Sequence, residues 1–334
     1  MESGEMTMGN ISLRFLNQAE ILALNLDFDS VLSVTEKALG EHARKAFEMP
    51  PKPGIHPSPG AFIHAMPAYL PDFRAAGLKW VSGFPENTEK GLPMIMGLLV
   101  LNDPETGFPI CLMDATWITN IRTAAVSTLA ANCFLQKNSR LLGIIGAGTQ
   151  GTYHTEMLKY AFPSIQEVLA FDTSEAQLEI FRNHMQEKNK LSVISASDPK
   201  AVFEESDIVI TATSKQHAPQ VSKSWLKQGG VYIGIESFRY WREEALLSAD
   251  KFVTDDWTQA QSFLKNTKHI NKKPKLYAEL GEIVSGVKPG RQKTHERIVC
   301  IFVGMALIDI ALGHMIYNMA LENGIGNDFM LAQF

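Results

Sequence analysis

Short apolar runs alternate with capped or amphipathic segments through the second half of the chain, from about residue 140 onward. A strand that is covered on both faces of a parallel sheet is apolar throughout, whereas a half-exposed strand alternates apolar and polar positions. The runs therefore predict six buried strands, at residues 141–145, 168–172, 192–196, 207–213, 230–235 and 251–255. Strands that alternate with helices in this order are typical of a doubly wound parallel sheet in an α/β fold.

The first part of the chain has a different pattern and predicts a second, α+β domain. Strands are expected at 12–16, 76–82, 94–102 and 108–113, and helices at 29–47 and 118–135. A long helix is predicted at 295–323, and its most apolar run of about 11 residues is shorter than the roughly 20 that a membrane span needs. We expect this helix to pack on the first domain, which then comprises 1–125 and 305–334, while 126–304 form the parallel-sheet domain.

Composition and charge narrow the possible functions. The 334 residues are 45% hydrophobic and carry a formal net charge of −5, so no basic surplus exists to neutralise nucleic-acid phosphates. The three cysteines lie far apart in apolar runs and predict reduced thiols, and the nine histidines show no metal-ligand spacing. The acidic N-terminus gives no sign of a secretory signal. We therefore expect a cytoplasmic protein that binds neither nucleic acid, membrane nor metal.

The glycine-rich sequence Gly146-Ala147-Gly148-Thr149-Gln150-Gly151 follows a predicted strand and opens a predicted helix. In a dinucleotide-binding loop the first glycine makes a tight turn, the second lets the backbone approach a pyrophosphate, and the third lets helix and strand pack closely. The helix N-terminus then faces the anion. The candidate cofactor-binding residues of this Rossmann domain are Gly146, Gly148, Thr149, Gln150 and Gly151. The alternative is a glycine-rich turn in an α/β fold that binds no cofactor.

Polar residues end two other predicted strands. Asp172 ends the second strand, where a carboxylate can bind ribose hydroxyls and would repel a 2′-phosphate, and no arginine follows it. This favours NAD over NADP, unless Asp172 only caps the next helix. Thr213 and Ser214 end the fourth strand, at the edge where the cofactor lies in such sheets, although a simple turn would explain them equally well.

Three charged residues stand where charge is unexpected. Lys79 lies in the middle of an apolar strand, and a buried lysine is unfavourable unless it is paired. Arg122 begins an alanine-rich helix and could hold a carboxylate through two parallel hydrogen bonds. Glu236 follows the fifth strand and could transfer a proton. For Lys79 the alternative is a structural ion pair. For Arg122 it is a surface or interdomain position, and for Glu236 it is a solvent-exposed position in a loop.

Several separated blocks of the chain resemble the ornithine cyclodeaminase and mu-crystallin family, and the resemblance extends from about Leu13 to Gly326. The blocks are 77–85 (GLKWVSGFP) with 91–93 (GLP), 101–107 (LNDPETG), 114–116 (DAT) with 121–125 (IRTAA), the glycine loop, and 279–286 (ELGEIVSG) with 289–291 (PGR). The resemblance implies a homodimer with a substrate-binding and dimerisation domain and a Rossmann domain that holds NAD(H) or NADP(H). It also implies hydride exchange at the α-carbon of an amino acid, through an imine.

By the same resemblance, Lys79 lies at the substrate α-carbon, Arg122 binds the substrate carboxylate, and Thr123 lies beside the cofactor. Lys52 falls where many members have a second carboxylate-binding arginine, and a lysine there keeps the charge but loses the two-point fork. The cyclodeaminases usually show a glycine-alanine-aspartate stretch after the fifth strand. This chain has Gly-Ile-Glu236 there, followed by an aromatic cluster that could shape a different pocket.

We therefore expect an NAD-dependent oxidoreductase that acts on an amino or imino acid, as an amino-acid dehydrogenase, a ketimine reductase or an enzyme of opine-type reductive amination. Lys79 and Glu236 are the candidate catalytic residues, and Lys52 and Arg122 are the candidate substrate ligands. A neutral Lys79, with its pKa lowered by burial, would take a proton, whereas a charged one would stabilise negative charge. Two alternatives are a cyclodeaminase that forms proline and ammonia with recycled NAD, and a mu-crystallin-like protein that binds NADPH or a small ligand.

Overall fold

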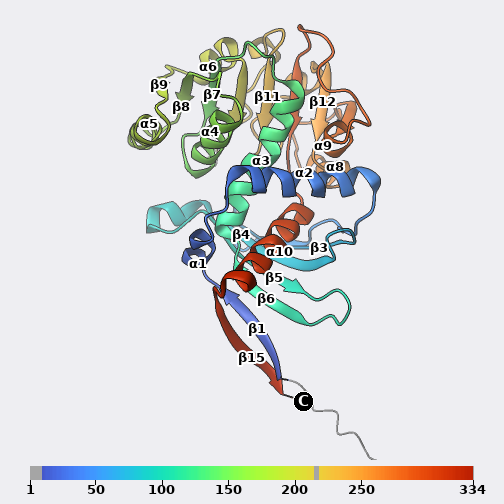
Figure 1. Cartoon of the computed structure of the whole chain (residues 1–334). Coiled ribbons are helices and arrows are strands. Elements are labelled where there is room, and N and C mark those ends of the chain that lie inside the picture. The colour runs from blue at the N-terminus through green and yellow to red at the C-terminus, as the bar shows by residue number, and fades with distance from the viewer. Residues whose placement is uncertain (1–9, 214–217, 334) are drawn as a thin grey trace, which may run out of the picture. The chain divides into compact units, whose positions relative to one another are not determined.

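The computed structural model describes residues 10–213 and 218–333, which contain two β-sheets (Figure 1). Two compact units hold them, as far as their residues are described. Unit 1 comprises Met1–Leu26, Phe47–Ile118 and Asp309–Phe334, and unit 2 comprises Asp27–Ala46 and Thr119–Ile308. Within the described ranges, no helix is long and apolar enough to cross a bilayer.

Sheet B of unit 2 is parallel throughout, in the strand order β13-β12-β14-β11-β10-β7-β8-β9. Its strands are β7 Leu141–Ile145, β8 Glu167–Phe171, β9 Ser192–Ser195, β10 Ile208–Thr211, β11 Val231–Gly234, β12 Lys251–Thr254, β13 Leu276–Glu279 and β14 Ile298–Ile301. The helices are α2 Phe28–Arg44, α3 Thr116–Phe134, α4 Thr149–Ala161, α5 Glu175–Asn189, α6 Pro199–Glu205, η2 Lys223–Trp225, α7 Glu243–Leu247, α8 Trp257–Lys265 and α9 Leu280–Val284, of which α3 begins in unit 1. The predicted doubly wound fold and its six strands are confirmed.

The predicted long helix at 295–323 is wrong in its first part. Ile298–Ile301 form β14, which lies between β11 and β12, and α10 begins only at Ala306. A short continuous apolar run looks the same in a buried strand and in a buried helix, so periodicity alone could not separate them. β13 was also missed, because it is only four residues long and follows a lysine-rich polar segment.

Helix α2 groups with unit 2, although the division from sequence placed it in the first domain. The reason is its close packing on α9: a Cβ at Gly281 would lie 2.5 Å from the carbonyl oxygen of Leu39. The roles assigned to the two predicted domains stay predictions.

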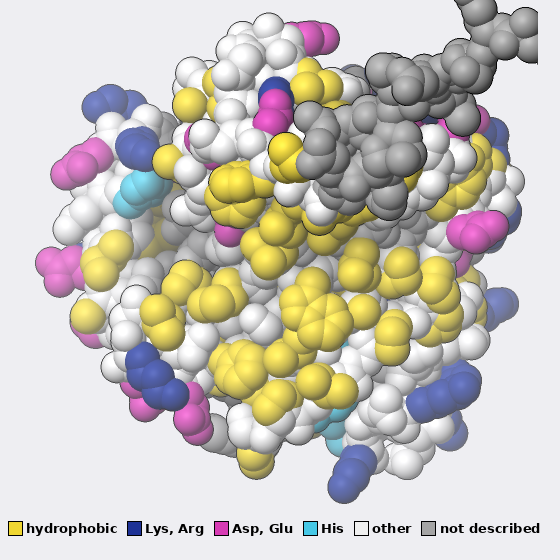
Figure 2. Space-filling view, turned by 90° about the horizontal axis from the view of Figure 1, so that it is seen from below, with side chains coloured by type: hydrophobic (Ala, Val, Ile, Leu, Met, Phe, Trp, Pro, Cys, Tyr) yellow, Lys and Arg dark blue, Asp and Glu magenta, His cyan; other side chains and the backbone are white. Residues whose placement is uncertain are grey.

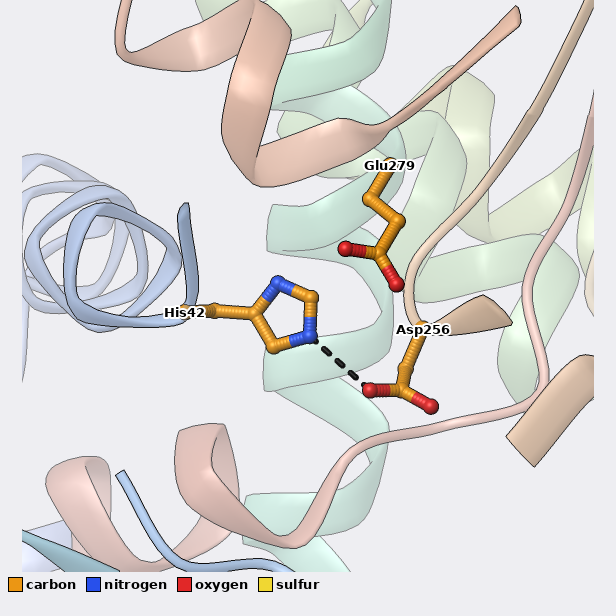
Figure 3. Close-up of side chains that lie close together, drawn as sticks. All are labelled: His42, Asp256 and Glu279. Carbon is orange, nitrogen blue, oxygen red and sulfur yellow. Dashed lines mark hydrogen bonds and ion pairs between the residues drawn. The ribbon is translucent and has the colours of Figure 1, made fainter. Parts of the chain in front are cut away.

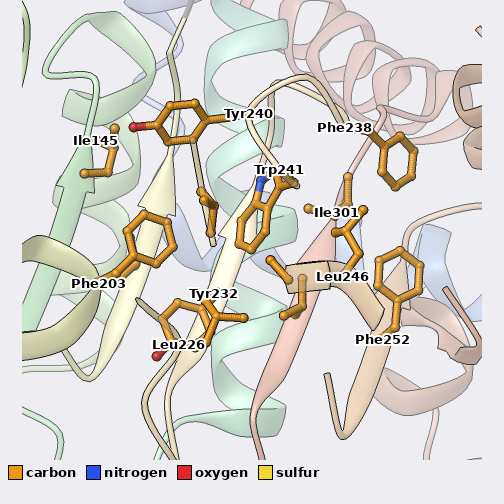
Figure 4. Packing of buried hydrophobic residues seen from close by; sticks show 14 of the residues in the cluster. Ile145, Phe203, Leu226, Tyr232, Phe238, Tyr240, Trp241, Leu246, Phe252 and Ile301 are labelled. Carbon is orange, nitrogen blue, oxygen red and sulfur yellow. The ribbon is translucent and has the colours of Figure 1, made fainter. Parts of the chain in front are cut away.

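Aromatic side chains pack beside sheet B in the core of unit 2 (Figure 4). The ring of Phe203 stacks on Tyr232 with centroids 5.5 Å apart, and lies edge-on to Trp241 at 5.9 Å. Phe238, Tyr240 and Trp241, which the sequence suggested as residues shaping a pocket, are all buried in this cluster. Their burial anchors the segment that follows β11.

Sheet A of unit 1 has the strand order β15-β1-β6-β5-β4-β3-β2 and is antiparallel except for the pair of β1 with β6. Its strands are β1 Asn10–Leu16, β2 Gly54–Ile55, β3 Phe62–Leu70, β4 Ala75–Gly83, β5 Ile95–Asn102, β6 Pro109–Asp114 and β15 Asn327–Gln333. The other elements are α1 Gln18–Ala23, η1 Pro85–Lys90 and α10 Ala306–Asn323, of which α10 begins in unit 2. Asn17 caps α1.

One face of sheet A, here called the α10 face, packs against α10. A Cβ at Gly77 would lie 2.9 Å from Cδ1 of Ile310, and a Cβ at Gly313 would lie 2.8 Å from Cδ2 of Leu99. These two glycines therefore let helix and sheet approach closely. Lys79 shares this face, because it stands two residues from Gly77 and directly opposite Leu99 in the register. The fold thus directs the side chain of Lys79 toward α10.

Candidate active site

The glycine loop joins β7 to α4, and its three glycines have different surroundings. Gly146 has φ +98°, which L side chains rarely adopt, and a Cβ there would lie 2.6 Å from the carbonyl oxygen of Ala212. A Cβ at Gly151 would lie 2.3 Å from the carbonyl oxygen of Gly146. At Gly148, by contrast, a Cβ would meet no atom within 4 Å. The backbone at Gly148 therefore borders open space, as approach to a pyrophosphate requires.

The start of α4 completes an anion-binding arrangement. Gly148 is the N-cap residue, and no side chain caps the helix. The first N–H groups of a helix have no partner within it and carry the positive end of its dipole. The predicted residues Thr149 and Gln150 occupy this first turn. The local geometry suits a phosphate, although direct binding by these residues stays a prediction.

Asp172 follows β8, and its carboxylate holds the glycine loop. Oδ2 accepts a hydrogen bond from the N–H of Ala147 at 2.8 Å, and Oδ1 accepts one from the N–H of Ser174 at 2.9 Å. The residue that caps α5 is Ser174. Each carboxylate oxygen has two lone pairs, so these bonds leave acceptor capacity for a ribose hydroxyl.

Thr213 lies just beyond the end of β10, beside the first glycine of the loop. A Cβ at Gly146 would lie 3.2 Å from its backbone nitrogen. Its Oγ1 is buried and has no hydrogen-bond partner among the described residues. A buried hydroxyl without a partner is unfavourable, so the position suits a polar group of a ligand. Ser214, the other residue predicted here, lies outside the described residues.

Helix α3 is connected to the glycine loop through a side-chain hydrogen bond. Nε2 of Gln150 donates to Oδ1 of Asn120 at 2.9 Å. Thr123, three residues further along α3, donates its hydroxyl to the carbonyl oxygen of Thr119 at 2.6 Å, within the same helix. The structure thus relates α3 to the loop, and the predicted contact of Thr123 with a cofactor stays a prediction.

Arg122 is 8% exposed, and its guanidinium lies against Gly304. Gly304 has φ +84°, and a Cβ there would lie 3.3 Å from Nη2 of Arg122. Buried Asp255 fixes this turn, because it accepts hydrogen bonds from the N–H of Gly304 at 2.6 Å and of Val303 at 3.1 Å. This role of Asp255 could not be identified from the sequence, where it stands beside a second acid, Asp256, which caps α8.

Lys79 forms a buried ion pair with Asp309 of α10. The distance from Nζ to Oδ2 is 2.7 Å, and the two side chains are 1% and 0% exposed. Such a carboxylate favours the charged ammonium, and removing either partner would leave a buried charge without compensation. The sequence left open an ion pair for Lys79 but did not identify Asp309, whose only local signal is an acid among the apolar residues at the start of α10.

Lys52 lies just before β2 in the same unit as Lys79. Both lysines lower the pKa of His64 in β3, although burial of the imidazole is the larger cause. The structure therefore brings Lys52, His64 and Lys79 close enough within unit 1 for their charges to interact. The predicted role of Lys52 in binding substrate stays a prediction.

Glu236 follows β11 and is half-buried, with its carboxyl group against two buried side chains. Oγ1 of Thr211 lies 2.8 and 2.9 Å from its two oxygens, and Nε1 of Trp241 donates to one of them at 3.1 Å. Burial of the carboxyl group raises its pKa to about 8, against the opposing effect of these hydrogen bonds. The contacts tie the segment after β11 to β10, and a part for Glu236 in proton transfer stays a prediction.

Three potential metal ligands lie together in unit 2 (Figure 3). Ligand atoms of His42, Asp256 and Glu279 all lie within 4.8 Å of one another. Nε2 of His42 is 2.9 Å from Oδ2 of Asp256, while Glu279 accepts a hydrogen bond from the N–H of Trp257 at 2.8 Å and pairs with Lys45. Each of the three thus has protein partners, and we assign the group to the packing of α2, α8 and α9.

We expect Glu236 to make the protein less stable as the pH rises. Its pKa of about 8 in the folded chain lies above the ordinary value of 4.5. Between these values the folded state keeps a proton that the unfolded state has released. The free energy of unfolding should therefore fall by up to roughly 1.4 kcal/mol per pH unit in that range. Chemical denaturation at several pH values measures this slope, and Glu236→Gln should reduce it.

A matched control is Glu244→Gln, which removes an exposed acid from α7 and should keep the slope of the wild type. If Glu236→Gln and the wild type show the same dependence on pH, the raised pKa of Glu236 is contradicted.

Comparison with known proteins agrees with the resemblance in sequence. The model of the ornithine cyclodeaminase/mu-crystallin family matches residues 14–324. The nodulation efficiency protein NfeD of Rhizobium meliloti is 34% identical over 315 residues, which cover 94% of this chain and 97% of that protein.

Two solved structures share the whole architecture. The Delta(1)-pyrroline-2-carboxylate reductase of Thermococcus litoralis, in complex with NADH and L-proline, is 30% identical with a TM-score of 0.85, over 95% of this chain and 100% of that one. An archaeal alanine dehydrogenase dimer with bound NAD is 31% identical with a TM-score of 0.85, over 96% of this chain and 100% of that one. On its sequence and on its fold, the chain belongs to the ornithine cyclodeaminase/mu-crystallin family.

Proposed function

We propose that this chain is an NAD-dependent oxidoreductase that exchanges a hydride with the α-carbon of an amino acid or imino acid. The observation that carries the proposal is the buried pair of Lys79 and Asp309 in a chain of this family. The two solved relatives, named as a reductase of an imino acid and a dehydrogenase of an amino acid, support it.

The residues of unit 2 fit a dinucleotide. The open position at Gly148 and the start of α4, which no side chain caps, suit a pyrophosphate. Oγ1 of Thr213 has no hydrogen-bond partner within 10–213 and 218–333, and it suits a polar group of the nicotinamide half. Asp172 suits ribose hydroxyls and disfavours a 2′-phosphate, so the proposed cofactor is NAD rather than NADP. When bound, this cofactor supplies or accepts the hydride.

Arg122 is the proposed ligand of the α-carboxylate. Its guanidinium carries five donors in a rigid fork that matches a carboxylate. The turn at Gly304, fixed by Asp255, holds that fork in place. A carboxylate bound in this way fixes the position of the adjacent α-carbon. Positioning the reacting groups can lower the activation barrier by several kcal/mol, up to ~7–11 kcal/mol at best.

Lys79 is the proposed proton donor to the imine nitrogen. The sequence left open whether Lys79 is neutral or charged. Oδ2 of Asp309 lies 2.7 Å from its Nζ and favours the charged form. During reduction the α-carbon gains the hydride and the nitrogen gains the proton of Lys79, so the C=N double bond becomes a C–N single bond. During oxidation the neutral lysine takes that proton back from the amine. Asp309 acts as a positioning residue through Lys79.

We also propose that the chain forms a homodimer through the face of sheet A opposite the α10 face. Trp80 and Leu98 are opposite each other in the register and 45% and 43% exposed, and Tyr69 of β3 shares their face. Figure 2 shows hydrophobic side chains gathered over a broad area of one face of the molecule. Such an area marks a protein interface, and the related alanine dehydrogenase is a dimer. A cytoplasmic location stays a prediction.

The function is tested by following the absorbance of NADH with a panel of substrates in both directions. The panel contains cyclic imino acids, 2-oxo acids with ammonium or amines, and amino acids with NAD. We expect a net change in NADH, with NADPH a poorer substrate. Proline and ammonia from ornithine without a net change would identify a cyclodeaminase instead, and no turnover of any substrate would favour a binding protein.

The pairing of Lys79 with Asp309 is tested by the pH profile of kcat/KM for imine reduction. In Asp309→Asn the buried ammonium loses its compensating charge and releases its proton at lower pH. The alkaline limb of the profile should therefore move down by about one pH unit or more. Glu86→Gln, which removes an exposed acid of η1, should leave the profile unchanged.

The double variant Lys79→Met/Asp309→Leu separates this role from folding. This variant removes both buried charges together. Replacing a buried ion pair by apolar residues often leaves stability unchanged, so the double variant should fold and bind NADH. Loss of the proton donor should lower its kcat by roughly 100-fold or more. Near-normal turnover would remove Lys79 from the mechanism, and an unmoved alkaline limb in Asp309→Asn would remove Asp309.

The dimer is tested by placing a charge in the exposed face of sheet A. Light scattering should give the wild type the mass of two chains, and Trp80→Glu or Leu98→Glu should give the mass of one, because a buried charge without a partner opposes association. Ile180→Glu changes an exposed apolar residue of α5 and should stay dimeric. A monomeric wild type, or variants that stay dimeric, would contradict this interface.

A further inference from the structure

Two polar side chains of α4 make hydrogen bonds to side chains of α3. Nε2 of Gln150 donates to Oδ1 of Asn120 at 2.9 Å. One turn further along α4, Nε2 of His154 lies 2.9 Å from Oγ of Ser127. His154 and Ser127 are fully buried. The proposed hydride transfer gives neither of them a role, although His154 comes only one turn after the start of the helix that the glycine loop opens.

The contacts of His154 fix the hydrogen on one nitrogen of its ring. Nδ1 lies 2.8 Å from the carbonyl oxygen of Gln150, which can only accept a hydrogen bond. Nδ1 therefore carries the hydrogen, and Nε2 of the neutral ring accepts a hydrogen bond from the hydroxyl of Ser127. Burial lowers the pKa of His154 to about 4, against the opposing effect of the bond to Gln150, and the charge of Arg122 lowers it further. At neutral pH the ring is thus uncharged, with a partner for each nitrogen.

The contacts with α4 hold one side of α3, whereas Arg122 stands on the other side. At about 3.6 residues per turn, Asn120 and Ser127 are only about 20° apart around the helix axis. Arg122 is roughly 160° from Asn120 around the same axis. The guanidinium of Arg122 lies against Gly304. Helix α3 is therefore fixed by α4 on one side and carries the proposed carboxylate ligand on the other.

A shift of α3 along α4 would move Arg122 relative to the glycine loop, and both belong to unit 2. The two contacts on α3 are about 10 Å apart along its axis, so together they fix both its rotation and its tilt. Buried polar networks in which every member has a partner favour one arrangement of the elements that they join. The pair of His154 and Ser127 is thus suited to set the distance from a bound carboxylate to a bound dinucleotide.

We propose that His154 and Ser127 are positioning residues for hydride transfer, which act through Arg122 and the glycine loop by holding α3 in register with α4. This inference rests on the proposed function. An apolar pair would also bury surface between the helices, but apolar contacts have no preferred direction and would not fix the register. Loss of the pair should therefore slow the reaction without weakening the binding of either ligand.

Steady-state kinetics of the full chain tests this role, with the substrate that the panel identifies. Ser127→Ala removes the hydroxyl from α3 and should lower kcat by at least about tenfold, since a misplacement of about 1 Å can cost about 100-fold. The KM values for NADH and substrate should stay within about twofold of the wild type, because the groups that bind them are unchanged. Calorimetry should find as many NADH sites as in the wild type. Thr35→Val, which removes a buried hydroxyl that bonds within α2, should keep the wild-type kcat.

A double-mutant cycle tests whether the two residues act as one unit. His154→Leu should lower kcat as Ser127→Ala does, and the double variant should be no slower than the slower of the two single variants. His154→Gln places a carbonyl oxygen where Nε2 accepts from Ser127, so it should retain part of the rate lost in His154→Leu.

The outcomes separate this inference from the proposed function. A wild-type kcat in both Ser127→Ala and His154→Leu would overturn the positioning role and leave hydride transfer intact. A fall in kcat that only matches a loss of NADH sites would also overturn it, since incomplete folding would explain the result. Effects that multiply in the double variant would show that the residues act separately and would overturn the pairing. No turnover by the wild type would overturn the proposed function, and the positioning role with it.

Discussion

The ion pair of Lys79 and Asp309 is the constraint around which unit 1 is arranged. An ammonium in the middle of an apolar sheet is unfavourable unless an opposite charge accompanies it. That charge comes from α10, and Gly77 and Gly313 let the helix approach the sheet closely enough for a contact of 2.7 Å. The packing of α10 and the protonation of Lys79 therefore depend on the same contact, which links the fold of unit 1 to its proposed chemistry.

In unit 2, two carboxylates, of half-buried Asp172 and buried Asp255, fix the backbone at the ends of parallel strands. Asp172 follows β8 and accepts a hydrogen bond from Ala147 in the glycine loop. Asp255 follows β12 and accepts one from Gly304, against which Arg122 lies. Hydrogen bonds from backbone N–H groups to a carboxylate are among the stronger ones in proteins, so both turns are held firmly. The proposed ligands of the cofactor and of the substrate carboxylate thus rest on the same kind of support.

Local patterns predicted most of the fold and part of the site. The loop from Gly146 to Gly151 could be recognised, because its three glycines stand at a fixed spacing within six residues, between a strand and a helix. Asp309 could not, since its significance depends on Lys79, which is far away in the sequence and meets it only across the packed α10 face. The same applies to Gly304, whose role appears only when Arg122 lies against it. Residues 298–301 were predicted as helix but form a strand. Every position of this buried run is apolar, so the run lacks the periodicity that distinguishes a strand from a helix.

The central claim is that Lys79 is a charged proton donor because Asp309 lies beside it. The most direct measurement is the nitrogen-15 chemical shift of its Nζ, assigned with Lys79→Arg and followed by NMR from about pH 6 to about pH 9, below the ordinary lysine pKa of about 10.4. The account predicts the shift of an ammonium throughout this range in the wild type, and the appearance of a neutral amine within it in Asp309→Asn. A neutral amine in the wild type at neutral pH would contradict the account.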